Sequence, residues 1–373
     1  ALIIVHLPRL RARLDALKAA FPSATLHAIA IKTHPHPRML GFLVESGFGL
    51  EAASMEEVDR ALAAGCPTHR LVFDSPVKTQ REIDRVAQMP GMLVNVNSLS
   101  ELRRFPEAPA CKLGIRINPE VHTGAPELFD VSSKESKFGV PISARDEIVN
   151  AALKFPVVAL HMHSGSQMKD LDVQEQALVS LRSLAEEINA LKPGAITTLD
   201  VGGGLPSEPL SGSTVMHDYG HRVGQVFHDQ PYELVTEFGQ WVHAECGVAL
   251  TTIEYVLAPG RLFLHLGADF FMRDAYTQAR KFPLAVWRAP GTLVQGESHP
   301  FDLAGPLCFA GDYLAHQVPL PATIDEGDVL SVDHTGANTY ALWSRHCSRT
   351  IPKVLSWDGN AVEVWSDRHL IEY

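Results

Sequence analysis

Apolar residues in the first two-thirds of the chain form short runs, and stretches with helical spacing separate these runs. Helical patterns lie at 55–64, 80–87 and 172–191. Continuous apolar strands that alternate with helices are typical of parallel strands buried on both faces. We therefore expect strands at 25–31, 47–51, 70–73, 92–97, 112–118, 157–163, 196–201 and 232–237.

Eight such strand–helix units within residues 7–240 predict a (β/α)8 barrel. A doubly wound open sheet is the main alternative, and the spacing alone leaves it open. After Gln240 the helical patterns give way to strand-like segments at 248–257, 261–266, 284–287, 328–333 and 361–366. This change predicts a separate antiparallel β domain over residues 241–373, which the strand-like residues 1–6 could join.

Length and charge narrow the class of protein. A chain of 373 residues usually needs more than one hydrophobic core, which agrees with two domains. The net charge is -11, and no basic cluster stands out, so we expect no nucleic-acid partner. No apolar stretch is long enough to cross a bilayer, so we expect no membrane partner. Because the chain starts at Ala1 rather than at a methionine, we also expect that residues precede it.

The cysteines indicate a reducing compartment. They are scattered singly and form neither a CxxC pair nor an evenly spaced framework: Cys66, Cys111, Cys246, Cys308 and Cys347. Reduced thiols in the cytoplasm are therefore the expected state.

Catalytic groups of a barrel lie at the carboxyl ends of its strands. The predicted strand ends supply a lysine, several acids, two histidines and a glycine turn: Lys32, Glu51, Asp74, Asn118, His161, His163, Gly202, Gly203, Gly204 and Glu237. A phosphate-bearing aldehyde cofactor needs groups of these kinds.

Lys32 and the glycine turn each have a functional and a structural interpretation. Lys32 ends an apolar run, and burial there would lower the pKa of its amine and make it a nucleophile. Alternatively, its side chain reaches past the rim into water. The glycines at 202–204 follow the seventh strand, where barrels commonly bind phosphate, but a tight turn also favours glycine.

His161 and His163 alternate on one strand and therefore point to the same side. They could bind a metal, but no third ligand has suitable spacing, so we expect no metal. His163 could instead stack on a planar cofactor, whereas a core histidine is the favoured interpretation of His161. Glu237 on its apolar strand needs a partner, either a protonated pyridine nitrogen or a rim arginine or lysine.

In sequence order, these segments resemble the fold-type III pyridoxal-phosphate (PLP) decarboxylases, the ornithine, arginine and diaminopimelate decarboxylase group related to alanine racemase. The resemblance rests on Ala30-Ile31-Lys32-Thr33-His34-Pro35, Phe48-Gly49-Leu50-Glu51-Ala52-Ala53-Ser54, His163-Ser164-Gly165-Ser166 and Leu199-Asp200-Val201-Gly202-Gly203-Gly204. It implies a Schiff base of PLP on Lys32 and a ring-stacking His163. It also implies phosphate contacts from Ser166 and from Gly202, Gly203 and Gly204, with Glu237 at the pyridine nitrogen.

The expected β domain adds Gly305-Pro306-Leu307-Cys308 followed by Asp312, which resembles the family's Gly-Pro-x-Cys signature. The resemblance implies a homodimer with two shared active sites, in which Cys308 of one subunit returns a proton in the other. Ser136-Lys137-Phe138-Gly139 resembles the segment with an interface lysine, so a pair between Lys137 and Asp312 is implied.

Three departures from the family pattern concern the phosphate and the substrate. Gln240, after Gly239, replaces an expected phosphate-binding arginine, and Asn338 replaces a phosphate-contacting tyrosine, although Tyr340 stands close by. These four residues are therefore expected as altered cofactor contacts. Phe309 stands where an acidic residue often reads the distal group of the substrate, which argues against a standard diaminopimelate, ornithine or lysine substrate.

The expected activity is PLP-dependent decarboxylation of an amino acid or amino-acid conjugate. A PLP-dependent racemase is the nearest alternative, although alanine racemases of this fold pair the pyridine nitrogen with an arginine rather than a carboxylate. A PLP-binding regulatory protein without turnover also stays open, as does a metal-dependent hydrolase that uses His161 and His163.

Overall fold

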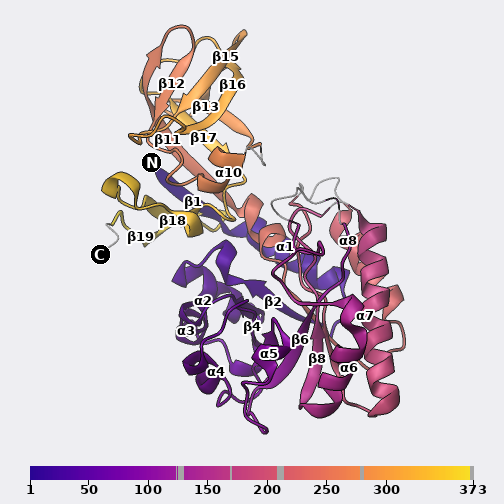
Figure 1. Ribbon diagram of the computed structural model, residues 1–373. Coiled ribbons are helices and arrows are strands. Elements are labelled where there is room, and N and C mark those ends of the chain that lie inside the picture. Colours follow the sequence, from indigo (N-terminus) through magenta and orange to yellow (C-terminus); the bar gives the residue numbers. More distant parts are fainter. Residues whose placement is uncertain (123, 125–129, 169, 208–213, 278–280, 370–373) are drawn as a thin grey trace. The chain divides into compact units, whose positions relative to one another are not determined.

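The structure is a computed structural model of residues 1–373, and it describes residues 1–122, 124, 130–168, 170–207, 214–277 and 281–369 (Figure 1). The chain divides into two compact units. The barrel unit is Arg13–Val242, and the β unit consists of Ala1–Ala12 and His243–Tyr373. Among the described residues, no helix has both the length and the apolar character that crossing a membrane requires.

Eight parallel strands of the barrel unit follow the order β5-β4-β3-β2-β10-β9-β8-β6, and the pairing of β5 with β6 closes the ring. This closure confirms the (β/α)8 barrel and excludes the open sheet. The strands coincide with the eight apolar runs: β2 Leu26–Ala30, β3 Gly49–Ala52, β4 Leu71–Phe73, β5 Leu93–Val96, β6 Lys112–Asn118, β8 Val157–His161, β9 Thr198–Asp200 and β10 Glu233–Thr236. The short β7 (Val140–Pro141) pairs with β6 outside the ring.

Helices connect these strands, and α7 packs beside both α6 and α8 (Figure 1). Local capping explains where several of them begin. The Ser54 side chain accepts a hydrogen bond from the N–H of Glu57 before α3, and Thr79 and Glu82 form a capping box before α4. The helices are α1 Leu7–Ala20, α2 Pro37–Glu45, α3 Met55–Ala63, α4 Gln80–Val86, α5 Leu99–Leu102, α6 Arg145–Lys154, α7 Leu171–Leu191, α8 Val215–Val226 and α9 Gln240–His243. Single 3-10 turns lie at Ile31–Thr33, Thr68–Arg70 and Ile142–Ala144.

Buried side chains from several strands fill the barrel. Ala28, Val72, Leu93, Ala159 and Val235 form one buried cluster, and each comes from a different strand. This packing fixes the strands relative to one another, so the residues that follow them are held in defined positions.

The β unit contains a mixed sheet in the order β14-β13-β17-β11-β1-β18-β19, and β12, β15 and β16 extend it from β11. The expected β domain is present, and its described strand pairs are antiparallel except for two: β1 runs parallel to β18, and β12 runs parallel to β15. The strands are β1 Leu2–His6, β11 Gly247–Leu257, β12 Arg261–Leu264, β13 Leu284–Arg288, β14 Thr292–Leu293, β15 Ser298–Ala304, β16 Tyr313–Pro321, β17 Val329–Asp333, β18 Lys353–Trp357 and β19 Val362–Ser366. One α-helix (α10, Met272–Thr277) and 3-10 turns at Ala244–Cys246, Tyr340–Leu342 and His346–Ser348 complete the described part.

Candidate active site

Lys32 lies in the 3-10 turn that follows β2. Its neighbours Ile31 and Thr33 are buried, whereas 45% of the Lys32 side chain is exposed. The Lys32 side chain is therefore partly exposed at the end of the strand. It also donates a short hydrogen bond to a carboxylate oxygen of Glu51, which is fully buried on β3.

Of the two interpretations of Lys32, the structure does not favour the one with a lowered pKa. Burial does lower the pKa of the Lys32 amine, but the nearby carboxylates of Glu51, Glu237 and Asp74 outweigh burial and raise it. Conversely, burial raises the pKa of Glu51, although the Lys32 ammonium opposes this shift. Without another group on its nitrogen, Lys32 is therefore an ammonium at neutral pH.

Glu237 directly follows β10, which pairs with β2 in the barrel. Its turn packs against the turn of Lys32, because a Cβ on Gly239 would lie 2.7 Å from the side-chain atoms of both Ala30 and Thr33. Only 3% of Glu237 is exposed. The two predicted groups at the ends of the first and last strands are thus neighbours in space.

The glycine loop lies against both Glu237 and His163. A Cβ on Gly203 would lie 2.5 Å from the Glu237 carbonyl oxygen, and the N–H of Gly203 donates a hydrogen bond of 3.3 Å to Nδ1 of His163. Gly204 has a φ of 103°, and a Cβ there would lie 1.9 Å from the carbonyl oxygen of Gly165. The half-buried Ser166 follows Gly165, so the loop and the segment after β8 lie side by side.

His163 has a neutral ring. Burial, together with the positive charges of Arg116 and Lys32, lowers the pKa of His163 to about 4, although Glu237 opposes this shift. Nδ1 of His163 lies 3.6 Å from a carboxylate oxygen of Glu237, and 17% of the His163 side chain is exposed. A neutral, partly exposed imidazole can pack against a planar ligand.

A buried group of charges surrounds these residues. Four of its members were among the predicted strand ends, whereas Asp200 and Arg116 were not identified as site residues from the sequence. Its acidic members are Glu51, Asp74, Asp200 and Glu237, and its basic members are Arg116 and His161. Burial raises the pKa of Asp74 to about 6 and raises that of Asp200 well above its ordinary value. Burial also raises the pKa of Glu237, but nearby groups, His161 first among them, outweigh burial and hold that pKa well below the ordinary range.

Asn95 on β5 links two of these acids. Its amide nitrogen donates to Asp74 at 2.8 Å and to Asp200 at 3.1 Å. The signal that could have identified this group is a polar side chain inside a buried strand, which Asn95, Arg116 and Asp200 share. No local spacing connects them, because each comes from a different strand.

Asp74, His161 and Glu237 have donor atoms within 4.8 Å of one another, a spacing that some metal sites share. One atom, Nε2 of His161, faces both carboxylates at 3.5 and 3.6 Å. The imidazole itself therefore takes the place of a cation between the two acids. His163 is not part of this group.

Three of the predicted site residues, Cys308, Phe309 and Asp312, lie close together in the sequence of the β unit. Cys308 is exposed, 38% of Phe309 is exposed, and the Phe309 ring lies 5.6 Å from that of Tyr276. Asp312 is buried and accepts hydrogen bonds from the N–H groups of Ala268 and Leu307 at 2.5 and 2.6 Å. Its proposed contact with Lys137 of another subunit stays a prediction.

The remaining predicted residues also stay predictions as cofactor or interface contacts. Gln240 begins α9, Asn338 is buried with a φ of 58°, and Tyr340 begins a 3-10 turn of the β unit. Lys137 is exposed in the barrel unit, and its backbone carbonyl accepts a hydrogen bond from Asn97 at 2.9 Å.

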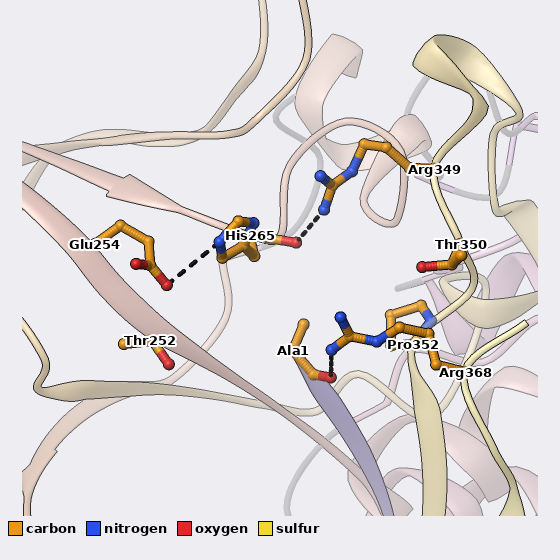
Figure 2. Close-up of a pocket in the computed structure, with 8 residues that line it drawn as sticks. All are labelled: Ala1, Thr252, Glu254, His265, Arg349, Thr350, Pro352 and Arg368. Atoms are coloured by element: carbon orange, nitrogen blue, oxygen red, sulfur yellow. Dashed lines mark hydrogen bonds and ion pairs between the residues drawn. The ribbon is translucent and has the colours of Figure 1, made fainter.

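A separate cavity of about 430 Å³ lies in the β unit and contains none of the predicted site residues (Figure 2). Charged partners already engage several of its side chains. Arg349 donates to buried Asp269 at 2.7 Å, and His265 lies 3.3 Å from Glu254. The lining residues are Ala1, Thr252, Glu254, His265, Arg349, Thr350, Pro352 and Arg368.

The barrel end fits PLP on observations independent of any relative. It offers the amine of a partly exposed lysine, and the Oε1 atom of buried Glu237 has no hydrogen-bond partner among the described residues. A glycine loop and a neutral histidine lie next to that carboxylate. The amine suits the aldehyde of PLP, and the carboxylate suits its pyridine nitrogen. The histidine suits the aromatic ring, and the glycine loop suits the phosphate.

Comparisons with known proteins agree. The sequence matches the family model of the pyridoxal-dependent decarboxylase, pyridoxal binding domain, over residues 7–244. It is 30% identical to the diaminopimelate decarboxylase of Pseudomonas aeruginosa over 376 residues, which cover 96% of this chain and 84% of that protein. The structure is similar to diaminopimelate decarboxylase from Helicobacter pylori complexed with L-lysine, with a TM-score of 0.89, 24% identity, and coverage of 98% of this chain and 93% of that chain. The arginine decarboxylase of Paramecium bursaria Chlorella virus bound to agmatine gives a TM-score of 0.80 at 19% identity, with 92% of each chain covered.

The structural likenesses support the fold alone, because their sequence identities are low. The family match and the Pseudomonas relative extend over most of the chain, and they show PLP as cofactor and decarboxylation of an amino acid as the reaction. This chain belongs to the family of pyridoxal-dependent decarboxylases.

Proposed function

We propose that the barrel end is the site of α-decarboxylation and that Lys32 holds PLP covalently. Glu237 pairs with the ring nitrogen, His163 packs against the ring, and Ser166 with Gly202, Gly203 and Gly204 contacts the phosphate. One observation carries this proposal: the turn of Glu237 packs directly against the turn of Lys32 through Gly239. The amine and the carboxylate can therefore serve one ligand.

PLP supplies an aldehyde that joins an amine and a ring that accepts the electron pair left by departing CO2. The protein supplies the electrostatic setting for this chemistry. Glu237, held ionised by its surroundings, stabilises a proton on the ring nitrogen. The glycine loop presents backbone N–H groups, which suit a phosphate.

The last step of the proposed reaction returns a proton to the α-carbon of the product. By the family resemblance, Cys308 of a second subunit donates this proton, and Lys32 is the alternative donor. Cys308 is exposed, as a residue that acts across a subunit boundary must be before assembly. A homodimer with shared sites, with Lys137, Asp312, Gln240, Asn338 and Tyr340 in their expected roles, belongs to the same proposal.

The proposed substrate is an amino acid or amino-acid conjugate without a cationic distal group. Phe309 and Tyr276 form an exposed aromatic pair beside Cys308, where the family often has an acid. An aromatic surface favours apolar or planar groups and cannot neutralise an ammonium as a carboxylate does. A cytoplasmic setting is also proposed, since none of the five cysteines, all in the described residues, forms a disulfide.

Covalent attachment tests the site. Purified protein would be incubated with PLP, reduced with borohydride and digested, and the modified lysine would be identified by mass spectrometry. We expect modification at Lys32 in the wild type, and loss of both the modification and CO2 release in Lys32→Ala. Lys112→Ala is the matched control, because Lys112 is also 45% exposed and carries an ion pair, but lies at the start of β6. Stable modification at another lysine, with Lys32 untouched, would contradict the proposal.

Substrate class needs a separate test. CO2 release would be measured with a panel that includes diaminopimelate, ornithine, lysine, carboxyalkyl or citryl conjugates, and D-isomers. We expect higher kcat/KM for members without a free distal amine. A clear preference for diaminopimelate would contradict this part and leave the assignment of Lys32 intact.

A further inference from the structure

His161 is a fully buried residue at the end of β8. Its Nε2 lies 3.5 Å from a carboxylate oxygen of Asp74 and 3.6 Å from one of Glu237. The two acids follow β4 and β10, so three strands of the barrel converge on one imidazole. The His161 ring is therefore buried, whereas the His163 side chain is partly exposed.

The acidic side chains around His161 are stable as anions only if a positive charge lies between them. The titratable and charged groups that the neighbouring elements bring to this region are Lys32, Glu51, Asp74, Arg116, His163, Asp200 and Glu237. Ionised carboxylates that share a buried site repel each other, and one of them takes up a proton unless a positive charge lies close. Of the basic groups, His161 is the one that contacts both Asp74 and Glu237.

A comparison with His27 argues against a plain core histidine. His27 is also buried in the barrel, but its Nδ1 lies 2.8 Å from the Thr236 hydroxyl, and it forms no ion pair with a carboxylate of the described residues. Burial lowers the pKa of His27 to about 4. Burial also lowers the pKa of His161, but Asp74, Asp200 and Glu237 outweigh it and raise that pKa to about 9. The same residue type thus has opposite charge states in one barrel.

We propose that His161 is a positioning residue, a buried imidazolium that keeps Glu237 ionised and holds its carboxylate toward the ring nitrogen of the cofactor. The proposal rests on the proposed role of Glu237 and explains what keeps that acid charged beside Asp74. Without the imidazolium, Asp74 and Glu237 would share a proton, and a protonated Glu237 could not stabilise a second proton on a ring nitrogen. His161 itself touches neither substrate nor cofactor in this account.

The first experiment observes the charge directly in cofactor-free protein. Histidine side chains would be labelled with ¹⁵N, and their protonation would be followed by NMR from pH 6 to pH 10. We expect one buried histidine to remain charged at pH 7.5, to disappear in His161→Gln, and to lose its proton at a pH at least one unit lower in Glu237→Gln. A neutral His161 at pH 7.5, or a bound metal ion found by elemental analysis, would overturn the proposal.

The second experiment measures the effect on the cofactor. PLP binding would be titrated by fluorescence quenching at pH 6 to 9 in wild type, His161→Gln and the control His27→Gln. We expect the Kd of His161→Gln at pH 8 to rise on the order of 10-fold, about one pKa unit of interaction, and kcat to fall with KM within a few-fold. His27→Gln keeps the wild-type profile, because His27 forms no ion pair with an acid of the described residues.

The two proposals fail in different ways. If Glu237→Gln leaves PLP binding and turnover unchanged, the proposed role of Glu237 itself is wrong. If Glu237→Gln impairs both and a folded His161→Gln impairs neither, only the role of His161 is wrong. Circular dichroism of each variant separates these outcomes from loss of folding.

Discussion

The backbone N–H of Glu237 donates a hydrogen bond of 2.7 Å to the carbonyl oxygen of Gly202. A backbone hydrogen bond thus joins the residue assigned to the ring nitrogen to the loop assigned to the phosphate. A planar cofactor has a fixed distance between its nitrogen and its phosphate, so the two binding groups must keep a fixed separation. This hydrogen bond supplies that constraint without any side chain.

Glu237→Gln should abolish most of the activity and preserve the fold. Glutamine has nearly the same shape but no negative charge, so it cannot stabilise a proton on the ring nitrogen. We expect CO2 release to fall about 100-fold or more, the magnitude typical of a lost electrostatic partner. Glu233→Gln is the control, since Glu233 lies on the same strand but is 67% exposed. Equal activity of both variants would remove Glu237 from the mechanism.

Gly204→Ala should weaken PLP binding through the backbone. Its φ of 103° is unfavourable for alanine, and the new Cβ would lie 1.9 Å from the Gly165 carbonyl oxygen. We expect a cost of about 1–3 kcal/mol in stability and a rise in the PLP Kd, measured by denaturation and by titration. Gly224→Ala on α8 is the control, because no atom lies within 4 Å of its Cβ position. It should instead stabilise the helix by about 0.5–1 kcal/mol.

The barrel and its main residues were predictable because each signal is local. An apolar run that ends in one polar residue marks both a strand and its carboxyl end, which is how Lys32 and Glu237 were found. The group around His161 could not be found in this way. Asp74, Asp200 and Glu237 each look like a single strand-end acid, and only closure of the ring makes them neighbours.

The sequence analysis missed four strands of the β unit, β14, β15, β16 and β18. Two of them, β15 and β16, were missed for a different reason. β15 contains Pro300, and β16 contains Pro319 and Pro321, residues that lower the expectation of a strand. Among the described strands, β16 pairs only with β15 and is therefore an edge strand, where a missing N–H is tolerated. The tertiary context thus permits what the local pattern disfavours.

The stability of the cofactor-free protein should fall as the pH rises from about 6.5 to 9. His161, with its pKa raised to about 9, contributes stability that is complete below its unfolded pKa of about 6.5 and is lost as the pH rises toward 9. The raised pKa of Glu51 acts in the same direction. His27 and His163 have pKa values lowered to about 4, so their neutral forms add stability above pH 6.5 that is lost as the pH falls.

Urea denaturation from pH 4 to pH 9.5 measures this profile. In His161→Gln, the decline between pH 6.5 and pH 9 should become shallower, since one of the groups that binds a proton more tightly in the folded state is gone. A free energy of unfolding that rises steadily up to pH 9 in the wild type would contradict the raised pKa values of His161 and Glu51.

Asp312→Ala should release the loop that carries Cys308. The Asp312 carboxylate accepts hydrogen bonds from Ala268 and Leu307, and it ties the loop to the segment after β12. Removing it leaves two N–H groups without an acceptor, at a cost of about 1–3 kcal/mol. In a Cys347→Ser background, Cys308 is the one exposed thiol, so its rate of reaction with a thiol reagent reports the loop. We expect a faster reaction in Asp312→Ala than in Asp312→Asn, and equal rates would assign Asp312 no part in holding the loop.

Phe309→Glu should shift the substrate preference toward amino acids with a cationic distal group. Phe309 is partly exposed and contacts Tyr276, so a carboxylate placed there stays hydrated and available to a ligand instead of being buried. A charge-assisted hydrogen bond to an ammonium contributes about 1.5–3 kcal/mol, which corresponds to a gain of about 10-fold or more in kcat/KM for ornithine or lysine. Phe309→Gln is the matched control, because it is polar and of similar length but uncharged. If the glutamate and glutamine variants change selectivity equally, the charge at position 309 does not read the substrate, and the distal group must be recognised elsewhere.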